Sequence, residues 1–180
     1  MVTETTLPDG APRTSRVART LVIIAVTLMV SMWVYVLYLA FGPGRADSPD
    51  KLDDPAFATA AQVRCDQALD LIATLQPATD APDAAARAVT LTQANDDLED
   101  MLADLKAIEP DGEDGVLVSR WLDDWAVYLG DRQSFAERLR TDPEARLLVT
   151  AKQQRQVTEY LDQFAKDNAM PACSTPTDAG

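Results

Sequence analysis

TLVIIAVTLMVSMWVYVLYLAF, residues 20–41, contains no charged residue and no proline. A helix rises 1.5 Å per residue, so this run is long enough to cross the roughly 30 Å hydrocarbon core of a bilayer. A single segment in lipid satisfies all of its backbone hydrogen-bonding groups only as a helix. We therefore expect one transmembrane helix at Thr20–Phe41, in contact with the lipid bilayer, and a separate domain after it.

The charges that flank this run indicate its orientation. Arg13, Arg16 and Arg19 precede it, whereas Arg45 and Lys51 follow it among several aspartates. Because Lys and Arg close to a span favour the cytoplasmic side, we expect a cytoplasmic N-terminus and an extracytoplasmic C-terminal domain at the cell membrane. A cleaved signal peptide is the alternative, but its apolar region would be only about 7–15 residues long. The longer run favours an uncleaved signal anchor.

The chain is strongly acidic, with 16 Lys+Arg, 29 Asp+Glu and a formal net charge of −13. Nearly all of the acidic residues follow Phe41, so the predicted outer domain carries the negative charge. Such a surface repels nucleic acid, and we expect no nucleic-acid partner. Arginine far outnumbers lysine and alanine is abundant. That composition is typical of a high-GC genome and favours a bacterial cell envelope.

The sequence contains no histidine. This excludes a Ser-His-Asp triad, a Cys-His nucleophile pair, histidine-ligated zinc and a Glu-x-x-His di-iron site. The acidic clusters at residues 50–54, 96–100 and 111–114 lack the spacing of a calcium-binding loop and are expected to be solvated. We therefore expect no catalytic residues, no metal site and no cofactor.

Two cysteines, Cys65 and Cys173, both follow the apolar run. A pair of cysteines outside the cytoplasm favours a disulfide, and two buried free thiols are the alternative. We expect a Cys65–Cys173 bond that fastens the end of the chain to the first helix of the outer domain.

Four helical patterns follow residue 54. They cover about residues 55–76, 80–108, 118–139 and 144–168, and each has residues at steps of three and four that we expect to face inward. The first two sets are Ala58, Ala61, Cys65, Ala68, Ile72 and Leu75, and Leu91, Ala94, Leu98, Met101, Leu105 and Ile108. The other two are Val118, Trp121, Trp125, Tyr128, Arg132, Phe135 and Leu139, and Leu147, Thr150, Gln154, Val157, Leu161, Phe164 and Asn168. No window alternates like a strand for long. The predicted fold class is therefore all-α, with a single N-terminal transmembrane helix and an extracytoplasmic antiparallel four-helix bundle. The predicted divisions are a disordered cytoplasmic tail at 1–19, the span at 20–41, a linker at 42–54, the bundle at 55–173 and a flexible tail at 174–180.

Polar side chains interrupt the apolar positions of these helices. The set is Arg87, Asn95, Asp124, Tyr128, Arg132 and Gln154. A buried charge needs a counter-charge, so Asp124 and Arg132 would pair if both face the inside of the bundle. The set can form a small polar ligand pocket between helices, or a satisfied network that fixes helix register. We favour the network.

The predicted third helix also carries the aromatic residues Trp121, Trp125, Tyr128 and Phe135 at steps of three and four. A platform for sugar binding is one interpretation of this set. Aromatic residues at helical spacing usually face a core, so we expect these to be buried.

These observations lead to a hypothesis about function. We expect a membrane-anchored extracytoplasmic envelope protein that is not an enzyme. It would bind another membrane or envelope protein as an accessory or scaffold subunit. The alternative is an extracytoplasmic sensor that binds a small ligand or ion and signals through a partner.

Overall fold

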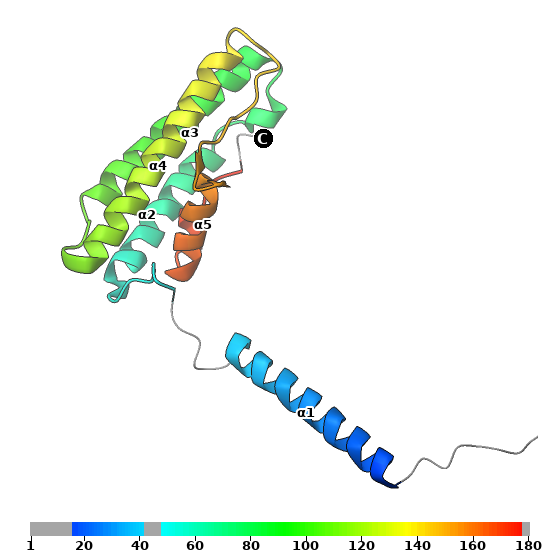
Figure 1. Ribbon diagram of the computed structural model, residues 1–180. Coiled ribbons are helices and arrows are strands. Elements are labelled where there is room, and N and C mark those ends of the chain that lie inside the picture. The colour runs from blue at the N-terminus through cyan, green and yellow to red at the C-terminus, as the bar shows by residue number, and fades with distance from the viewer. Residues whose placement is uncertain (1–15, 42–47, 178–180) are drawn as a thin grey trace, which may run out of the picture. The chain divides into compact units, whose positions relative to one another are not determined.

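The structure is a computed structural model that describes residues 16–41 and 48–177 (Figure 1). These residues fall in two compact units, which divide between Asp47 and Ser48. The predicted tail up to residue 15, the linker residues 42–47 and the final residues 178–180 lie outside the described part. The chain is mostly helical, as its sequence predicts.

Helix α1, Arg16–Phe41, forms the first unit and is long and apolar enough to cross a membrane. Two hydroxyl groups within it bond to the backbone one turn earlier: Thr20 donates to the Arg16 carbonyl at 3.0 Å and Thr27 to the Ile23 carbonyl at 2.9 Å. These bonds matter in lipid, where unsatisfied polar groups are costly. The helix begins at Arg16, so residues 16–19 belong to it rather than to the predicted disordered tail.

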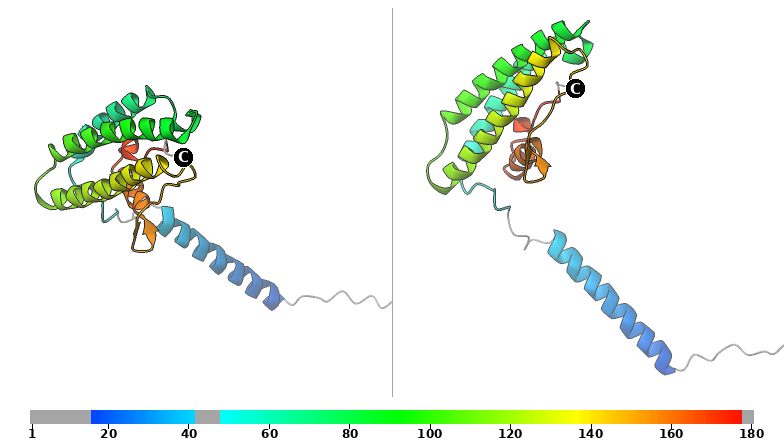
Figure 2. Two further views of the ribbon diagram at one scale, coloured as in Figure 1. Left: turned by 90° about the horizontal axis from the view of Figure 1, so that it is seen from above. Right: turned by 45° about the horizontal axis from the view of Figure 1, so that its top comes forward.

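Three long helices build most of the second unit: α2 (Pro55–Ala73), α3 (Ala84–Lys106) and α4 (Gly112–Leu139). They run up, down and up with short connections, of which the first contains the 3₁₀ turn η1 (Ala78–Asp80) (Figures 1 and 2). Aspartates begin two of them, because the carboxylates of Asp54 and Asp83 accept the amides of Ala56 and Ala86 in the first turns of α2 and α3.

The inward faces of these helices are the ones that the apolar spacing predicts. The predicted inward residues of α4 are all at most 3% exposed: Val118, Trp121, Trp125, Tyr128, Arg132, Phe135 and Leu139. Most of the predicted residues of α2 and α3 are buried as well, including Ala61, Cys65, Leu91, Leu98 and Leu105. The core therefore forms where the steps of three and four place it.

The fourth predicted helix is wrong in its first half. Helix α5 is short, Val157–Asp167; residues 141–144 form a turn after α4, and residues 145–150 run as an extended segment along the bundle. A two-stranded hairpin of β1 (Ala151–Lys152) and β2 (Arg155–Gln156) separates that segment from α5 (Figure 1). The domain therefore has three long helices, an extended segment and a short fourth helix instead of the predicted four long helices.

The extended segment follows the alternation of a strand. Ala145, Leu147 and Val149 are half-buried, whereas the residues between them are exposed. Leu147 and Val149 pack on the core. The carboxylate of Asp131 fixes the end of the segment, because it accepts the Thr150 amide at 2.6 Å and the Thr150 hydroxyl at 2.9 Å. An extended residue advances about twice as far as a helical one, so the six residues 145–150 span about 20 Å.

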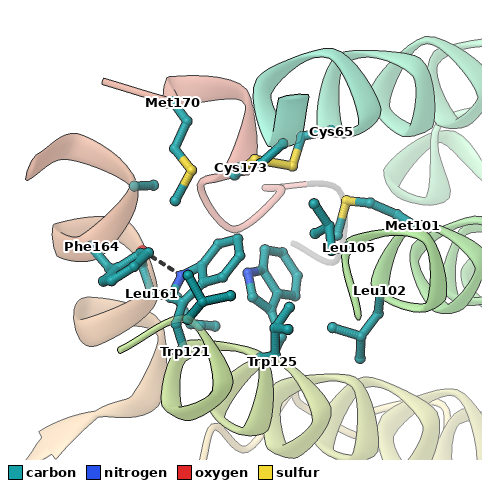
Figure 3. Close-up of a cluster of buried hydrophobic side chains, with 14 of the residues drawn as sticks. Cys65, Met101, Leu102, Leu105, Trp121, Trp125, Leu161, Phe164, Met170 and Cys173 are labelled. Atoms are coloured by element: carbon teal, nitrogen blue, oxygen red, sulfur yellow. Dashed lines mark hydrogen bonds between the residues drawn. A yellow bond between two sulfur atoms is a disulfide. The ribbon is translucent and has the colours of Figure 1, made fainter. Parts of the chain in front are cut away.

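The centre of the domain contains the aromatic residues and the predicted disulfide (Figure 3). Cys65 of α2 and Cys173 of the 3₁₀ turn η2 (Pro171–Cys173) are bonded, and both are fully buried. Trp121 and Trp125 meet edge to face, with ring centres 6.3 Å apart. In this view the nitrogen edge of Trp125 is turned toward the Trp121 ring (Figure 3). The aromatic residues are core, as predicted.

Segments at both ends of the domain are more ordered than predicted. Leu52, in the predicted linker, is buried, and its amide donates to Asn168 Oδ1 at 2.8 Å. Thr175, in the predicted flexible tail, donates from its amide to Asp162 Oδ1 at 2.7 Å. Tyr128 donates to the Pro176 carbonyl at 3.4 Å. The packed domain therefore includes residues 48–54 and 174–177.

Asp114, in the first turn of α4, holds the segment that enters the domain. Its two carboxylate oxygens accept the amides of Asp53 and Asp54, each at 3.0 Å. These bonds favour the ionised carboxylate, so they lower the pKa of Asp114 below its ordinary value of 3.8. A negative charge also suits the N-terminus of a helix.

We expect this attachment to depend on acid. Because the folded pKa of Asp114 is the lower one, its contribution is complete above 3.8 and is lost as the pH falls through the folded value. Hydrogen exchange should show Asp53 and Asp54 amides that are protected near neutral pH and released in acid. In Asp114→Ala both amides should exchange faster at neutral pH and show no acid-dependent step. Equal protection in variant and native protein would contradict this assignment.

Candidate functional site

Three of the six predicted polar residues meet inside the domain. Arg132 is 1% exposed, and its Nε donates to Asn95 Oδ1 at 2.7 Å. Its Nη1 lies 3.5 Å from the Tyr128 hydroxyl, and its guanidinium stands 5.7 Å from the centre of the Tyr128 ring. Asn95 on α3 is thereby joined to α4, and Tyr128 continues the network to the chain's last described segment. This arrangement is typical of a network that fixes helix register.

The other three residues lie elsewhere. Asp124 does not pair with Arg132: Lys152 Nζ donates to both of its oxygens, at 2.7 and 2.8 Å. Gln154 is exposed in the hairpin turn, because the helix predicted around it does not form. The guanidinium of Arg87 stands 5.4 Å from the centre of the Phe135 ring, near the far end of α4. The conditional pairing of Asp124 with Arg132 is therefore not formed, and the expected inward position of Gln154 is wrong.

The space beside the buried network is small. Asn95 borders a hollow of about 160 Å³ between α3 and α4. Ligand pockets usually have about 300–1,000 Å³. Asn95 Nδ2 is buried and has no hydrogen-bond partner among the described residues. One amide group beside a hollow of this size gives little support to a ligand pocket here.

A larger cleft opens between α4, α5 and the hairpin. Its volume is about 260 Å³. Its lining combines apolar, amide and charged side chains, namely Asp50, Leu117, Arg120, Trp121, Asp124, Lys152, Gln153, Arg155, Tyr160, Gln163 and Phe164. Of the six predicted polar residues, only Asp124 contributes to it. We name this feature the α4–α5 cleft and treat it as the candidate site.

Aromatic packing makes the floor of the α4–α5 cleft rigid. Trp121 stacks on Phe164 with ring centres 5.2 Å apart and an interplanar angle of 25°. Phe57 meets the Trp121 ring edge to face at 6.3 Å. The indole Nε1 of Trp121 donates to the Leu161 carbonyl at 3.3 Å, which joins α4 to α5 (Figure 3). The floor is therefore fixed by the same contacts that build the core.

The rim of the cleft is positively charged. Arg120, Lys152 and Arg155 contribute three cations, against the carboxylates of Asp50 and Asp124. Lys152 is held by Asp124. Neither Arg120 nor Arg155 lies within salt-bridge distance of a carboxylate in the part of the chain that the structure describes. Two guanidinium groups therefore remain available to an anion at one cleft of a strongly acidic protein.

The hairpin places two of these cations. Lys152 and Arg155 are directly opposed across its two strands, so their side chains emerge on the same face of the ribbon. Both stand over the Tyr160 ring, with Lys152 Nζ at 5.6 Å and the Arg155 guanidinium at 4.5 Å from its centre. Gln153 and Gln154 form the turn with φ of 48° and 70°, as a two-residue turn of type I′ requires.

Metal binding has no structural support in the described ranges. No group of three or more His, Cys, Asp or Glu side chains is placed there to hold an ion. Asp97 belongs to the acidic cluster of α3, and its pKa is raised by partial desolvation and by the neighbouring charges of Asp100 and Asp96. Mutual repulsion is the expected behaviour of acids on one helix face.

No known protein family, curated protein or solved structure matches this chain. The ligand class of the α4–α5 cleft must therefore be argued from its own residues. They offer guanidinium and amide donors at the rim and apolar surface below. The lining contains no serine, threonine or cysteine, and Lys152 neutralises Asp124.

Proposed function

We propose that this chain is a single-pass protein of a bacterial cell membrane, with its N-terminus in the cytoplasm and its helical domain outside. In this proposal the outer domain is a non-enzymatic accessory or scaffold module that binds another membrane or envelope protein. The α4–α5 cleft is the observation that carries the proposal. It joins a rigid apolar floor to a cationic rim on a domain that is otherwise strongly acidic.

The composition of the cleft favours binding over catalysis. Covalent catalysis needs an activated nucleophile with a base beside it. The lining supplies no serine, threonine or cysteine nucleophile, the Tyr160 ring is covered by two cations, and the carboxylate of Asp124 is engaged by Lys152. Its volume of about 260 Å³ suits a few inserted side chains better than a whole drug-sized ligand.

The ligand-sensor alternative has less support. It requires the interior polar residues to converge on a cavity. Asn95, Tyr128 and Arg132 bond to one another instead, while Asp124 lies at the α4–α5 cleft and Gln154 is exposed. We therefore favour protein binding.

The proposal predicts a defined topology. A reporter that is active only outside the cytoplasm should be active when fused after Gly180, and a reporter active only in the cytoplasm should be inactive there. The reason is the arginine cluster before the apolar run. N-terminal sequencing of the membrane-bound protein should recover the span. A mature N-terminus just after Phe41 would show cleavage and contradict the anchor.

Partner binding is tested by photocrosslinking in living host cells with the full-length chain. A photoreactive amino acid is placed at exposed sites on three helices, Val63, Val89 and Val127, and at two cleft sites, Gln153 and Gln163. We expect a discrete adduct with one envelope protein from at least one of the five sites. No adduct from any of them would contradict a protein-binding function.

A further inference from the structure

We propose that the α4–α5 cleft is the docking groove for an acidic peptide segment of the partner, which inserts one apolar side chain between carboxylates. This inference rests on the proposed function and names the chemistry of the partner. Three features carry it: the size of the cleft, the two guanidinium groups without a carboxylate partner, and the occupied aromatic faces.

The size of the cleft suits a short extended peptide segment. Its α4 side extends from Leu117 to Asp124, which is about 10 Å along a helix. A volume of about 260 Å³ lies just below the range of roughly 300–1,000 Å³ that small-molecule pockets have. One large side chain and a short stretch of backbone fill that space. Leu117 and Phe164 provide apolar contact for the inserted side chain, and the amides of Gln153 and Gln163 can bond to backbone groups.

The charges of the cleft favour a ligand that carries carboxylates. Arg120 and Arg155 have no carboxylate within salt-bridge distance among the described residues. A guanidinium binds a carboxylate through two parallel hydrogen bonds, which are stronger than bonds between neutral groups. Stacking on Tyr160 orders Arg155 before any ligand arrives, so less conformational entropy is lost on binding. Lys152 and Asp124 neutralise each other, so the positive charge available at the rim comes from the two arginines.

The rest of the domain makes this docking selective. The chain carries a net charge of −13, so an acidic segment is repelled from most of its surface. At the cleft, three cations outnumber two carboxylates. Attraction at one place and repulsion elsewhere restrict the segment to a single position and direction.

The aromatic residues of the cleft argue against a sugar. Carbohydrate stacking needs an open aromatic face. Two cations stand over the Tyr160 ring, and Trp121 is 3% exposed and stacked on Phe164. A basic segment would meet the cations of the rim. The acidic peptide is the ligand that matches both the floor and the rim.

The test identifies the captured segment. Photocrosslinker at Gln153 or Gln163 is activated in cells that express the full chain, and the crosslinked partner peptide is sequenced by mass spectrometry. We expect a segment with at least two Asp or Glu residues beside an apolar one. Arg120→Glu together with Arg155→Glu should reduce the adduct about tenfold or more, because two charge-assisted bonds become repulsive. Arg146→Glu, at an exposed cation outside the cleft, should leave the yield unchanged.

The outcomes separate this inference from the proposed function. Adducts from Val63, Val89 or Val127 with none from the cleft sites would overturn the inference and keep a protein-binding function. A captured segment that is basic or uncharged, or one whose yield survives the double charge reversal, would do the same. Circular dichroism of the variants controls for folding. A synthetic peptide of the captured sequence should then bind the purified protein and weaken as salt increases.

Discussion

Removing the Cys65–Cys173 bond should lower the free energy of unfolding by about 2–5 kcal/mol. The bond closes a loop of 108 residues, which contains the second half of α2, all of α3, α4 and α5, and the hairpin. In the chain-entropy model, closing a loop of that length raises the free energy of the unfolded chain by about 4–5 kcal/mol, because the chain has fewer conformations. Both cysteines are fully buried, so the loss of packing in the folded state adds to the effect.

Denaturant unfolding of the helical domain that follows α1 measures this effect. The double variant Cys65→Ala/Cys173→Ala is preferred to serine, because a serine hydroxyl would be buried without an assured partner. Reducing agent should lower the midpoint of the native protein and leave that of the double variant unchanged. Two free thiols in protein exported by its own host, or a midpoint insensitive to reductant, would show that the bond does not stabilise the domain.

The second large effect is expected at the buried Arg132. Arg132→Ala should lower the free energy of unfolding by about 3–5 kcal/mol, because it opens a cavity and leaves Asn95 Oδ1 without its donor. Asn95→Ala should cost about 1.5–3 kcal/mol, since a buried charged group loses an acceptor. Arg120→Ala, an exposed arginine on the same helix, should stay within about 0.5 kcal/mol.

A double-mutant cycle isolates the contact between these two residues. The cost of Arg132→Ala with Asn95→Ala should fall short of the sum of the single costs by about 0.5–3 kcal/mol. The same cycle for Asp124 and Arg132 should be nearly additive, because Asp124 bonds to Lys152 instead. Strong coupling between Asp124 and Arg132 would contradict the network described above.

The sequence predicted the helices whose periodicity is continuous. On α4 the whole inward set, from Val118 to Leu139, is buried, because steps of three and four leave only one face that can enter a core. The same reasoning predicted a helix at residues 144–156, which is wrong. Leu147, Thr150 and Gln154 fit a helical step by coincidence, whereas Ala145, Leu147 and Val149 fit a strand. The alternation was the available signal, and it was too short to outweigh the helical pattern.

The candidate cleft was less predictable than the fold. Its cations Lys152 and Arg155 depend on a hairpin whose turn, Gln153-Gln154, lacks the Asn-Gly or Gly residues that usually announce it. Asp124 was recognised as a polar residue near the core, but spacing along α4 alone suggested Arg132 as its partner. The actual partner is 28 residues away on another element, and spacing within one helix cannot identify such a contact.

The disulfide also determines how the domain would carry a mechanical load. Tension applied between α1 and the residues after Cys173 follows the chain to Cys65, crosses the covalent bond and leaves at Ser174. The long loop between the cysteines is bypassed and bears none of that tension. A partner held in the α4–α5 cleft pulls instead on elements inside the loop, which only packing and hydrogen bonds restrain. The force needed to unfold the domain should therefore be higher when it is pulled through the residues after Cys173 than when it is pulled through the α4–α5 cleft.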